Sequence, residues 1–256
     1  MEPLYSFTQP TYPSSSKEMT LKRERMLLLA IDTSSPIGSV ALRDEKRLVG
    51  LLTACVKSTH SEGLMPAVDS LLHRTGRDVS ELTALACTSG PGSYTGLRVG
   101  MATGQGIAFA LGLPCVALST LDVFAESVPY AAYPLCPILP ARKGWLYARM
   151  YRRQNGEILP CTDELYVQPD ELIKRIQEPM IFYGPGLESY RSDLRETLGS
   201  LFFELPCVWD VPRADILAEL AFRKLRNGGG MEPARLLPHY LGPSQAEVNW
   251  KQRQHG

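Results

Sequence analysis

The sequence has no excess of charge of either sign and no long apolar run. Its 256 residues include 27 basic and 27 acidic side chains, so no overall field attracts nucleic acid or an anionic membrane. No stretch approaches the roughly 18 apolar residues of a membrane-spanning helix, and residues 1–25 lack the apolar core of a secretion signal. These absences predict a cytoplasmic protein without a membrane contact, in which RNA is met through a local patch or a partner.

Cysteine and histidine are too sparse and too scattered for the common metal sites. The six cysteines lie more than twenty residues apart, which excludes the paired spacing of zinc and redox motifs. Several lie in apolar runs, so we expect reduced, buried thiols. None of the four histidines is near the glycine-rich stretch described below, so a serine triad lacks a base. We therefore expect no resident metal or cofactor.

Strand-like and helix-like patterns alternate along the chain, which is typical of an α/β fold. Strands are predicted at 26–32, 39–43 and 47–54, followed by a helix over 60–75 and a buried strand over 83–88. The order of these elements favours a meander of strands, after which the chain continues into helices.

The composition of the sequence changes after residue 128, where a run of proline, tyrosine and alanine begins. We place a domain boundary there. Residues 1–25 are interpreted as a disordered extension or a segment added to the natural chain. The other predicted parts are an N-terminal domain over 26–128, a smaller domain over 129–212, a helix at about 213–227 that packs back on the first domain, and a C-terminal tail over 228–256.

A glycine-rich stretch, CTSGPGSYTGLRVG over 87–100, stands between a predicted strand and a predicted helix. Its glycine spacing fits neither a P-loop nor a dinucleotide fingerprint, and it lacks the spacing of a nucleophile elbow. Two interpretations remain: Ser93 caps the helix, or N–H groups at the helix N-terminus bind an anion or nucleotide. In the second, the contacts come from Thr33, Ser34, Gly92, Ser93 and Thr95.

Small residues recur at every fourth position inside the predicted helix. One row is Gly96, Gly100, Gly104 and Ala108, and a second row beside it is Ala102, Gly106 and Ala110. An interior glycine costs up to about 1 kcal/mol relative to alanine, so we expect a close approach of another backbone in return. That backbone is either the helix over 60–75 of the same chain or a helix of another protein.

Four runs of the sequence carry a resemblance to a known family. They are AIDTS at 30–34, HSEGLMP at 60–66, SGPGSYTGLRVG at 89–100 and PHYL at 238–241. Together they resemble the bacterial TsaB family, over about residues 26–250. This family takes part in making N6-threonylcarbamoyladenosine at position 37 of tRNAs.

The resemblance implies an α/β, actin-like (ASKHA, ribonuclease H-like) two-domain fold with mixed sheets flanked by helices. It also implies a non-catalytic subunit that activates the transferase TsaD in a heterodimer. The ATPase TsaE joins that complex, and tRNA is met indirectly through it. A homodimer through the same face is the competing assembly, and the competing function is an autonomous enzyme, either metallopeptidase-like or an ATP-dependent small-molecule kinase.

The resemblance also assigns roles to individual residues. The row Gly96, Gly100, Gly104 and Ala108, with His60 and Leu64 of the preceding helix, is expected to contact TsaD in an intermolecular helical bundle. Gly100→Leu is then expected to overfill that contact while the isolated chain stays folded.

Two further sets of positions follow from the resemblance. The two histidines with which TsaD holds a metal fall on Thr120 and Phe124, whose hydroxyl and phenyl ring do not replace imidazoles. The chain departs from many relatives at Pro140, where they have aspartate, and at Gly242, where they have arginine, so contacts made by those side chains are in doubt.

The predicted strand after Gly144 places aromatic and basic side chains on one face, namely Trp145, Tyr147, Arg149, Tyr151 and Arg153. Arg149 and Arg153 are candidates for an RNA contact, with the aromatic rings stacking on bases. The alternative is an amphipathic strand whose polar face is solvated or packs under the next helix.

Overall fold

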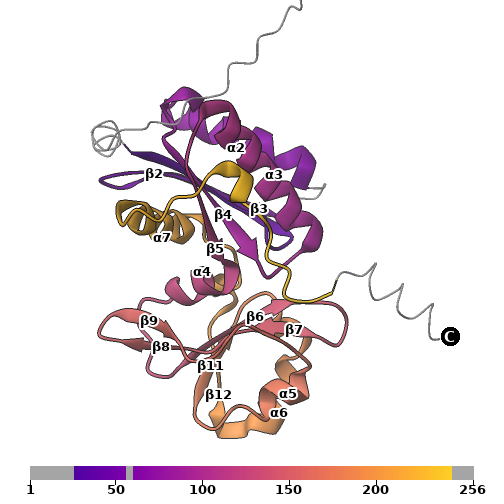
Figure 1. The fold of residues 1–256 in the computed structure, drawn as a ribbon. Helices are drawn as coiled ribbons and strands as arrows, with labels where there is room; N and C mark the ends of the chain where they lie inside the picture. Colours follow the sequence, from indigo (N-terminus) through magenta and orange to yellow (C-terminus); the bar gives the residue numbers. More distant parts are fainter. Residues whose placement is uncertain (1–25, 56–59, 244–256) are drawn as a thin grey trace, which may run out of the picture.

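The computed structural model describes residues 26–55 and 60–243, which form two domains, one above the other in Figure 1. The predicted extension over 1–25 and the last part of the predicted tail, 244–256, lie outside the described residues. Each domain is built on one β-sheet whose faces are covered by helices.

The sheet of the first domain has five strands in the order β3-β2-β1-β4-β5. The first three strands form an antiparallel meander, and β4 and β5 join β1 in parallel. Central parallel strands are buried on both faces, which explains the apolar run LLLAID of β1. The strands span Leu27–Asp32 (β1), Ile37–Asp44 (β2), Leu48–Cys55 (β3), Ala84–Gly90 (β4) and Cys115–Ser119 (β5).

Alternate side chains of β1 enter two separate cores on the two faces of this sheet. Leu29 and Ile31 pack under α2 and α3, whereas Leu28 and Ala30 pack under α7. The helix predicted near the end of the chain therefore lies on the first sheet, as Figure 1 shows. These helices span His60–Thr75 (α2), Tyr94–Leu111 (α3) and Ala214–Arg226 (α7).

The second sheet repeats the strand order of the first. Its main path is β10-β7-β6-β11-β12, in which β6, β7 and β10 are antiparallel neighbours and β11 and β12 join β6 in parallel; β8 and β9 form an added hairpin. The elements span Leu135–Pro140 (β6), Leu146–Ala148 (β7), Tyr151–Gln154 (β8), Glu157–Pro160 (β9), Leu165–Val167 (β10), Pro169–Ile173 (α5), Met180–Tyr183 (β11), Arg191–Leu198 (α6) and Phe202–Glu204 (β12). Two such domains in tandem confirm the actin-like α/β fold.

Helix α4, Thr120–Glu126, joins the two domains. Leu121 and Phe124 pack in one core with Leu135 and Tyr183 of the second domain. The hydroxyl of Tyr183 donates a hydrogen bond to the carbonyl of Phe124 at 2.9 Å. The space between the domains behind α4 is therefore filled by side chains.

The segment after α7 does not project from the molecule as a free tail. Met231 pairs with Cys115 at the edge of the first sheet, and Leu236 is buried in the core under α3. The backbone N–H of His239 donates to the carbonyl of Ser89 at 2.7 Å. The expected tail over 228–256 is thus corrected for its described part, up to residue 243, because apolar side chains hold it on the first domain.

Only half of the cysteines are buried as expected. Burial raises the pKa of the thiols of Cys115, to about 11, and of Cys136, to about 12, and it raises that of Cys87 as well. Cys55, Cys161 and Cys207 are exposed. No helix among the described residues is long and apolar enough to cross a membrane.

A chain of ion pairs links β2, α7 and α4. Glu219 of α7 accepts hydrogen bonds from Arg43 and Arg223, and Arg223 reaches Glu126 of α4 at 3.1 Å. Burial by itself raises the pKa of Glu219, but the hydrogen bonds and charges of the two arginines outweigh it, so this pKa lies below its ordinary value of 4.5.

Glu219→Gln is therefore expected to lower the free energy of unfolding at pH 7 by about 1 kcal/mol. A carboxyl whose pKa is depressed by folding stabilises above its ordinary pKa and loses this effect as the pH falls below it. The difference between variant and parent should shrink as the pH falls below about 4. Urea unfolding across this pH range measures the difference in free energy of unfolding. Glu188→Gln, which changes a highly exposed carboxyl, is the control. A difference that does not change with pH would contradict the stabilising role of the Glu219 carboxylate.

A candidate partner interface on helix α3

The glycine-rich turn after β4 ends in a capped helix. Ser93 is the N-cap of α3, and its hydroxyl accepts a hydrogen bond from the N–H of Gly96 at 3.2 Å. Gly112, in the left-handed region at φ 64°, ends the helix. The capping interpretation of Ser93 is therefore confirmed.

The Thr33–Ser34 turn after β1 lies directly against this cap. The N–H of Ser93 donates to the carbonyl of Ser34 at 2.7 Å, and the hydroxyl of Thr33 donates to the carbonyl of Gly96 at 2.7 Å. A Cβ on Gly92 would lie 2.5 Å from the carbonyl oxygen of Ser34. Only glycine fits this approach of the two backbones.

These contacts correct the expected anion or nucleotide site. Thr33 and Ser34 are buried, and the hydroxyl of Ser34 donates to Asp32 at 2.7 Å. The groups expected to face phosphates thus bind one another and other groups of the same chain. Thr95 lies apart, exposed on the first turn of α3.

The first row of small residues on α3 faces the chain's own sheet. A Cβ on Gly96 would meet the carbonyl oxygen of Thr33, one on Gly100 would meet the Thr33 hydroxyl, and one on Gly104 would lie 2.6 Å from the sulfur of Cys87. Ala108 is fully buried in the same core. The prediction that this row contacts TsaD is wrong, because β1 and β4 already occupy it.

The two residues expected from α2 do not restore that interface. Leu64 is buried in the core that α2 and α3 share. His60 begins α2, and its side chain lies outside the described residues. Gly100→Leu is then expected to unfold the chain instead of disturbing a partner alone.

The second row of small residues is the one that faces outward. Ala102, Gly106 and Ala110 are exposed, and the same row begins with Tyr94 and Arg98. A Cβ on Gly106 would meet nothing within 4 Å. The charged residue Arg98, near the start of this row, was the signal in the sequence that the row is exposed.

A shallow groove runs along this outward row. Its volume is about 440 Å³, and its lining is Ala102, Gln105, Gly106, Phe109, Ala110, Pro233 and Ala234. Phe109, with 59% of its surface exposed, is a large apolar side chain at the edge of the groove. Helix α2 contacts α3 and exposes Met65. This apolar face has the properties of a protein-binding surface.

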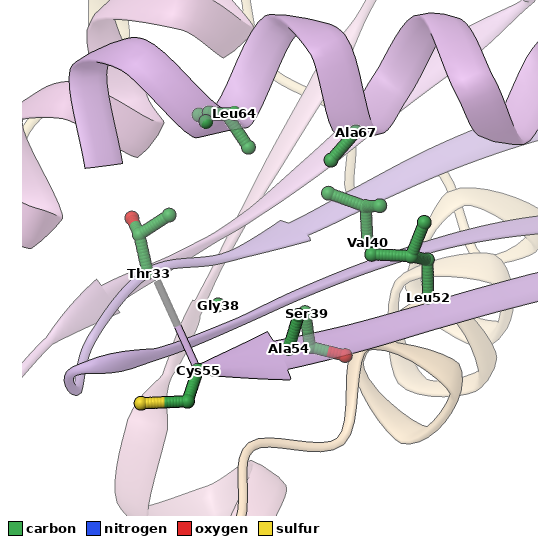
Figure 2. A pocket seen from close by; sticks show the side chains of 10 residues that line it. Thr33, Gly38, Ser39, Val40, Leu52, Ala54, Cys55, Leu64 and Ala67 are labelled. Atoms are coloured by element: carbon green, nitrogen blue, oxygen red, sulfur yellow. The ribbon is translucent and has the colours of Figure 1, made fainter. Parts of the chain in front are cut away.

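A second cavity, of about 290 Å³, lies under the N-terminal half of α2 (Figure 2). Figure 2 shows Leu64 and Ala67 of α2 on one side and Val40 and Leu52 of the sheet on the other. Its hydroxyls are engaged, since Thr33 bonds to Gly96 and Ser39 lies 2.7 Å from the Thr53 hydroxyl. None of the described residues that line it carries a charged side chain.

Thr120 and Phe124, where the resemblance places the two metal histidines of TsaD, are both buried in α4. Phe124 belongs to the core between the domains. The described residues also contain no group of three or more histidine, cysteine, aspartate or glutamate side chains that could hold a metal ion.

The two arginines proposed for RNA are paired with acidic side chains of α4. Arg149 binds Asp122 at 3.0 Å, and Arg153 binds Glu126 at 3.3 Å. Arg149 also donates to the carbonyl of Thr162 and Arg153 to that of Val128. An RNA contact by Arg149 or Arg153 would have to break these ion pairs with α4.

Pro140 and Gly242, the two positions at which the chain is expected to differ from many relatives, lie on the same side of the second domain. Pro140 is exposed at the end of β6, opposite Leu146. A Cβ on Gly242 would lie 2.8 Å from the ring of Tyr166 and 3.1 Å from the hydroxyl of Tyr147. Tyrosine rings thus close the space next to Gly242.

The two rows of α3 predict opposite effects of the same substitution. Gly104→Ala overpacks against Cys87 and Leu85 and should lower the free energy of unfolding by about 1–2 kcal/mol. Gly106→Ala meets no atom and should raise it by about 0.5–1 kcal/mol, because alanine favours helices. Chemical denaturation of both variants measures the changes, and equal signs would show that the inward and outward rows are misassigned.

Comparisons with known proteins point to a single family. A family model described as TsaD, tRNA N6-adenosine threonylcarbamoyltransferase, matches residues 40–250. The tRNA threonylcarbamoyladenosine biosynthesis protein TsaB of Bacillus subtilis is 30% identical over 90% of this chain and 100% of its own. That of Escherichia coli is 28% identical over 88% and 97%.

A solved structure gives the same result. YeaZ from Pseudomonas aeruginosa superposes with a TM-score of 0.73 and 30% identity, over 84% of this chain and 100% of that protein. Since likeness in sequence and in fold extends over the whole length of these relatives, the chain belongs to the TsaB family of tRNA threonylcarbamoyladenosine biosynthesis proteins.

Proposed function

We propose that the chain serves in the formation of N6-threonylcarbamoyladenosine at position 37 of tRNAs as a non-catalytic partner that binds and activates the transferase TsaD. The observation that carries this proposal is the outward face of α3, where a row of small residues and Phe109 border an open apolar groove. The interface therefore lies on Ala102, Gly106 and Ala110, one row away from the glycines that first suggested it.

The chemistry of this face suits a helix as its occupant. Small residues let the backbone of a neighbouring helix approach closely, and a flanking aromatic side chain supplies an anchor that fills a pocket on the partner. Because the chain matches a family model that describes TsaD, the two proteins have related folds. A pairing of equivalent helices from two related folds would resemble the isologous interface of a homodimer.

The non-catalytic role is supported by what replaces catalytic groups in this chain. Phe124 and Thr120 are packed where the resemblance places metal ligands, which disfavours a metallopeptidase. The Thr33–Ser34 turn is bonded to the start of α3, where a kinase needs room for phosphates. The chain then acts through the surface that it presents to TsaD, and TsaE joins the assembly.

Gly106→Leu is expected to abolish co-purification with TsaD and to reduce tRNA modification by the complex at least tenfold. The leucine fills the groove from the exposed side, so the isolated variant should stay folded. Pull-down and a threonylcarbamoylation assay measure the two effects, and circular dichroism checks the fold.

Gly106→Ala is the matched control, because its single methyl group adds little volume and leaves the groove open. A Gly106→Leu variant that still binds TsaD would place the interface elsewhere. Light scattering of the isolated chain, with and without TsaD, separates a heterodimer from a homodimer through the same face. Peptide cleavage or ATP turnover by the isolated chain would overturn the non-catalytic role.

A further inference from the structure

Two arginines on one side of the molecule lie over aromatic rings without an acidic partner. Arg98 of α3 lies 5.4 Å from the centre of the Tyr94 ring, and Arg142, between β6 and β7, lies 4.8 Å from that of Trp145. Within the described part of the chain they form no ion pair, and their side-chain hydrogen bonds go to the hydroxyls of Tyr94 and Tyr166. Among the described residues, no carboxylate is therefore paired with either guanidinium group.

Each arginine belongs to a stack of rings. The rings of Tyr94 and Tyr240 are stacked with their centres 4.7 Å apart, and those of Trp145 and Tyr166 with theirs 4.5 Å apart. Tyr94 and Tyr240 each expose 44% of their surface. Trp145 and Tyr166 are partly buried. A positive charge beside stacked rings thus occurs twice, once on each domain, with the more exposed rings on the first.

The last described segment of the chain joins the two stacks into one surface. Figure 1 shows this segment, in yellow, running from the first domain to β6 and β7 of the second. Tyr240 stacks on Tyr94, and two residues later Gly242 lies against the ring of Tyr166. The backbone hydrogen bond from His239 to Ser89 holds the segment on the first domain directly before Tyr240.

We propose that this surface, formed by Tyr94, Arg98, Arg142, Trp145, Tyr166 and Tyr240 and named here the arginine–aromatic patch, binds unpaired nucleotides of the tRNA that the complex modifies. Aromatic rings and guanidinium planes stack on bases of any sequence, and unpaired arginines bind phosphates. The proposal rests on the proposed function, because it takes tRNA as the substrate of the complex.

The ion pairing of the other arginines supports this assignment. Arg149 and Arg153 must release Asp122 and Glu126 before they could meet a phosphate, whereas Arg98 and Arg142 need release no carboxylate. Because the formal net charge of the chain is zero, the patch acts only at short range. It is therefore expected to add to tRNA binding within the complex.

The test measures tRNA binding by the assembled complex of this chain and TsaD over a series of salt concentrations. The probe is an unmodified tRNA transcript, and the variants are Arg98→Ala, Arg142→Ala and the double substitution. Each lost phosphate contact makes the slope of log K against log salt less steep by about 0.7–0.9. The slope of the double variant should therefore be less steep than that of the parent by about 1.5.

Arg195→Ala is the matched control. Arg195 also lies 5.4 Å from an aromatic ring, that of Phe202, but it is bonded to Glu204 at 2.6 Å on α6. Its removal changes the net charge by the same amount and should leave the salt slope unchanged. Tyr240→Leu should weaken tRNA binding about tenfold at fixed salt, with an unchanged slope, because it removes stacking and no charge.

Three outcomes would overturn the proposal. A double variant with the parent's affinity and slope would show that the patch does not contact RNA. Loss of TsaD from the double variant would make the patch a protein contact instead, since Arg98 lies on the same row of α3 as Ala102. An unsubstituted complex that forms but binds no tRNA would overturn the patch together with the tRNA substrate of the proposed function.

Discussion

The close approach of α3 to the Thr33–Ser34 turn and to β4 is the constraint on which the rest of this structure depends. Gly96 and Gly100 lie so near Thr33 that any Cβ would collide with it, and a Cβ on Gly104 would lie 2.6 Å from the sulfur of Cys87. Four glycines in one helix cost up to about 1 kcal/mol each, and the packing of α3 on buried strands offsets this cost. Two consequences follow at once: the space at the end of β1 is closed, and the opposite face of α3 is turned to solvent.

Sequence reasoning predicted the elements of the first domain well because each has a strong local signal. The LLLAID run, the apolar face of 60–75 and the capped start at Ser93 agree with β1, α2 and α3. The strands β10 and β12 were missed, because three residues carry too short a pattern for periodicity to register. The motifs that carry the family resemblance lie mainly in the well-predicted domain.

The candidate site was predicted less well, because a periodic row on a helix does not reveal which side is buried. The rows that begin at Gly96 and at Ala102 have the same spacing, and both are small enough for close packing. Their neighbours distinguish them: Leu97 and Met101 flank the inward row, whereas Arg98 lies on the outward one. The ion pairs of Arg149 and Arg153 were missed for a related reason, since their acidic partners are remote in sequence and meet them only when α4 packs on the second domain.

The interior of the molecule and its surface thus have separate roles. Between the domains, Leu121, Phe124 and Tyr183 form a core, and two ion pairs fasten α4 to the second sheet. Side chains from both domains therefore fill and bond the junction between them. What remains available for recognition is the outward face of α3 and the surface along the last described segment, and these adjoin at Tyr94 and Arg98. A protein with two neighbouring binding surfaces is suited to hold one macromolecule in place beside another.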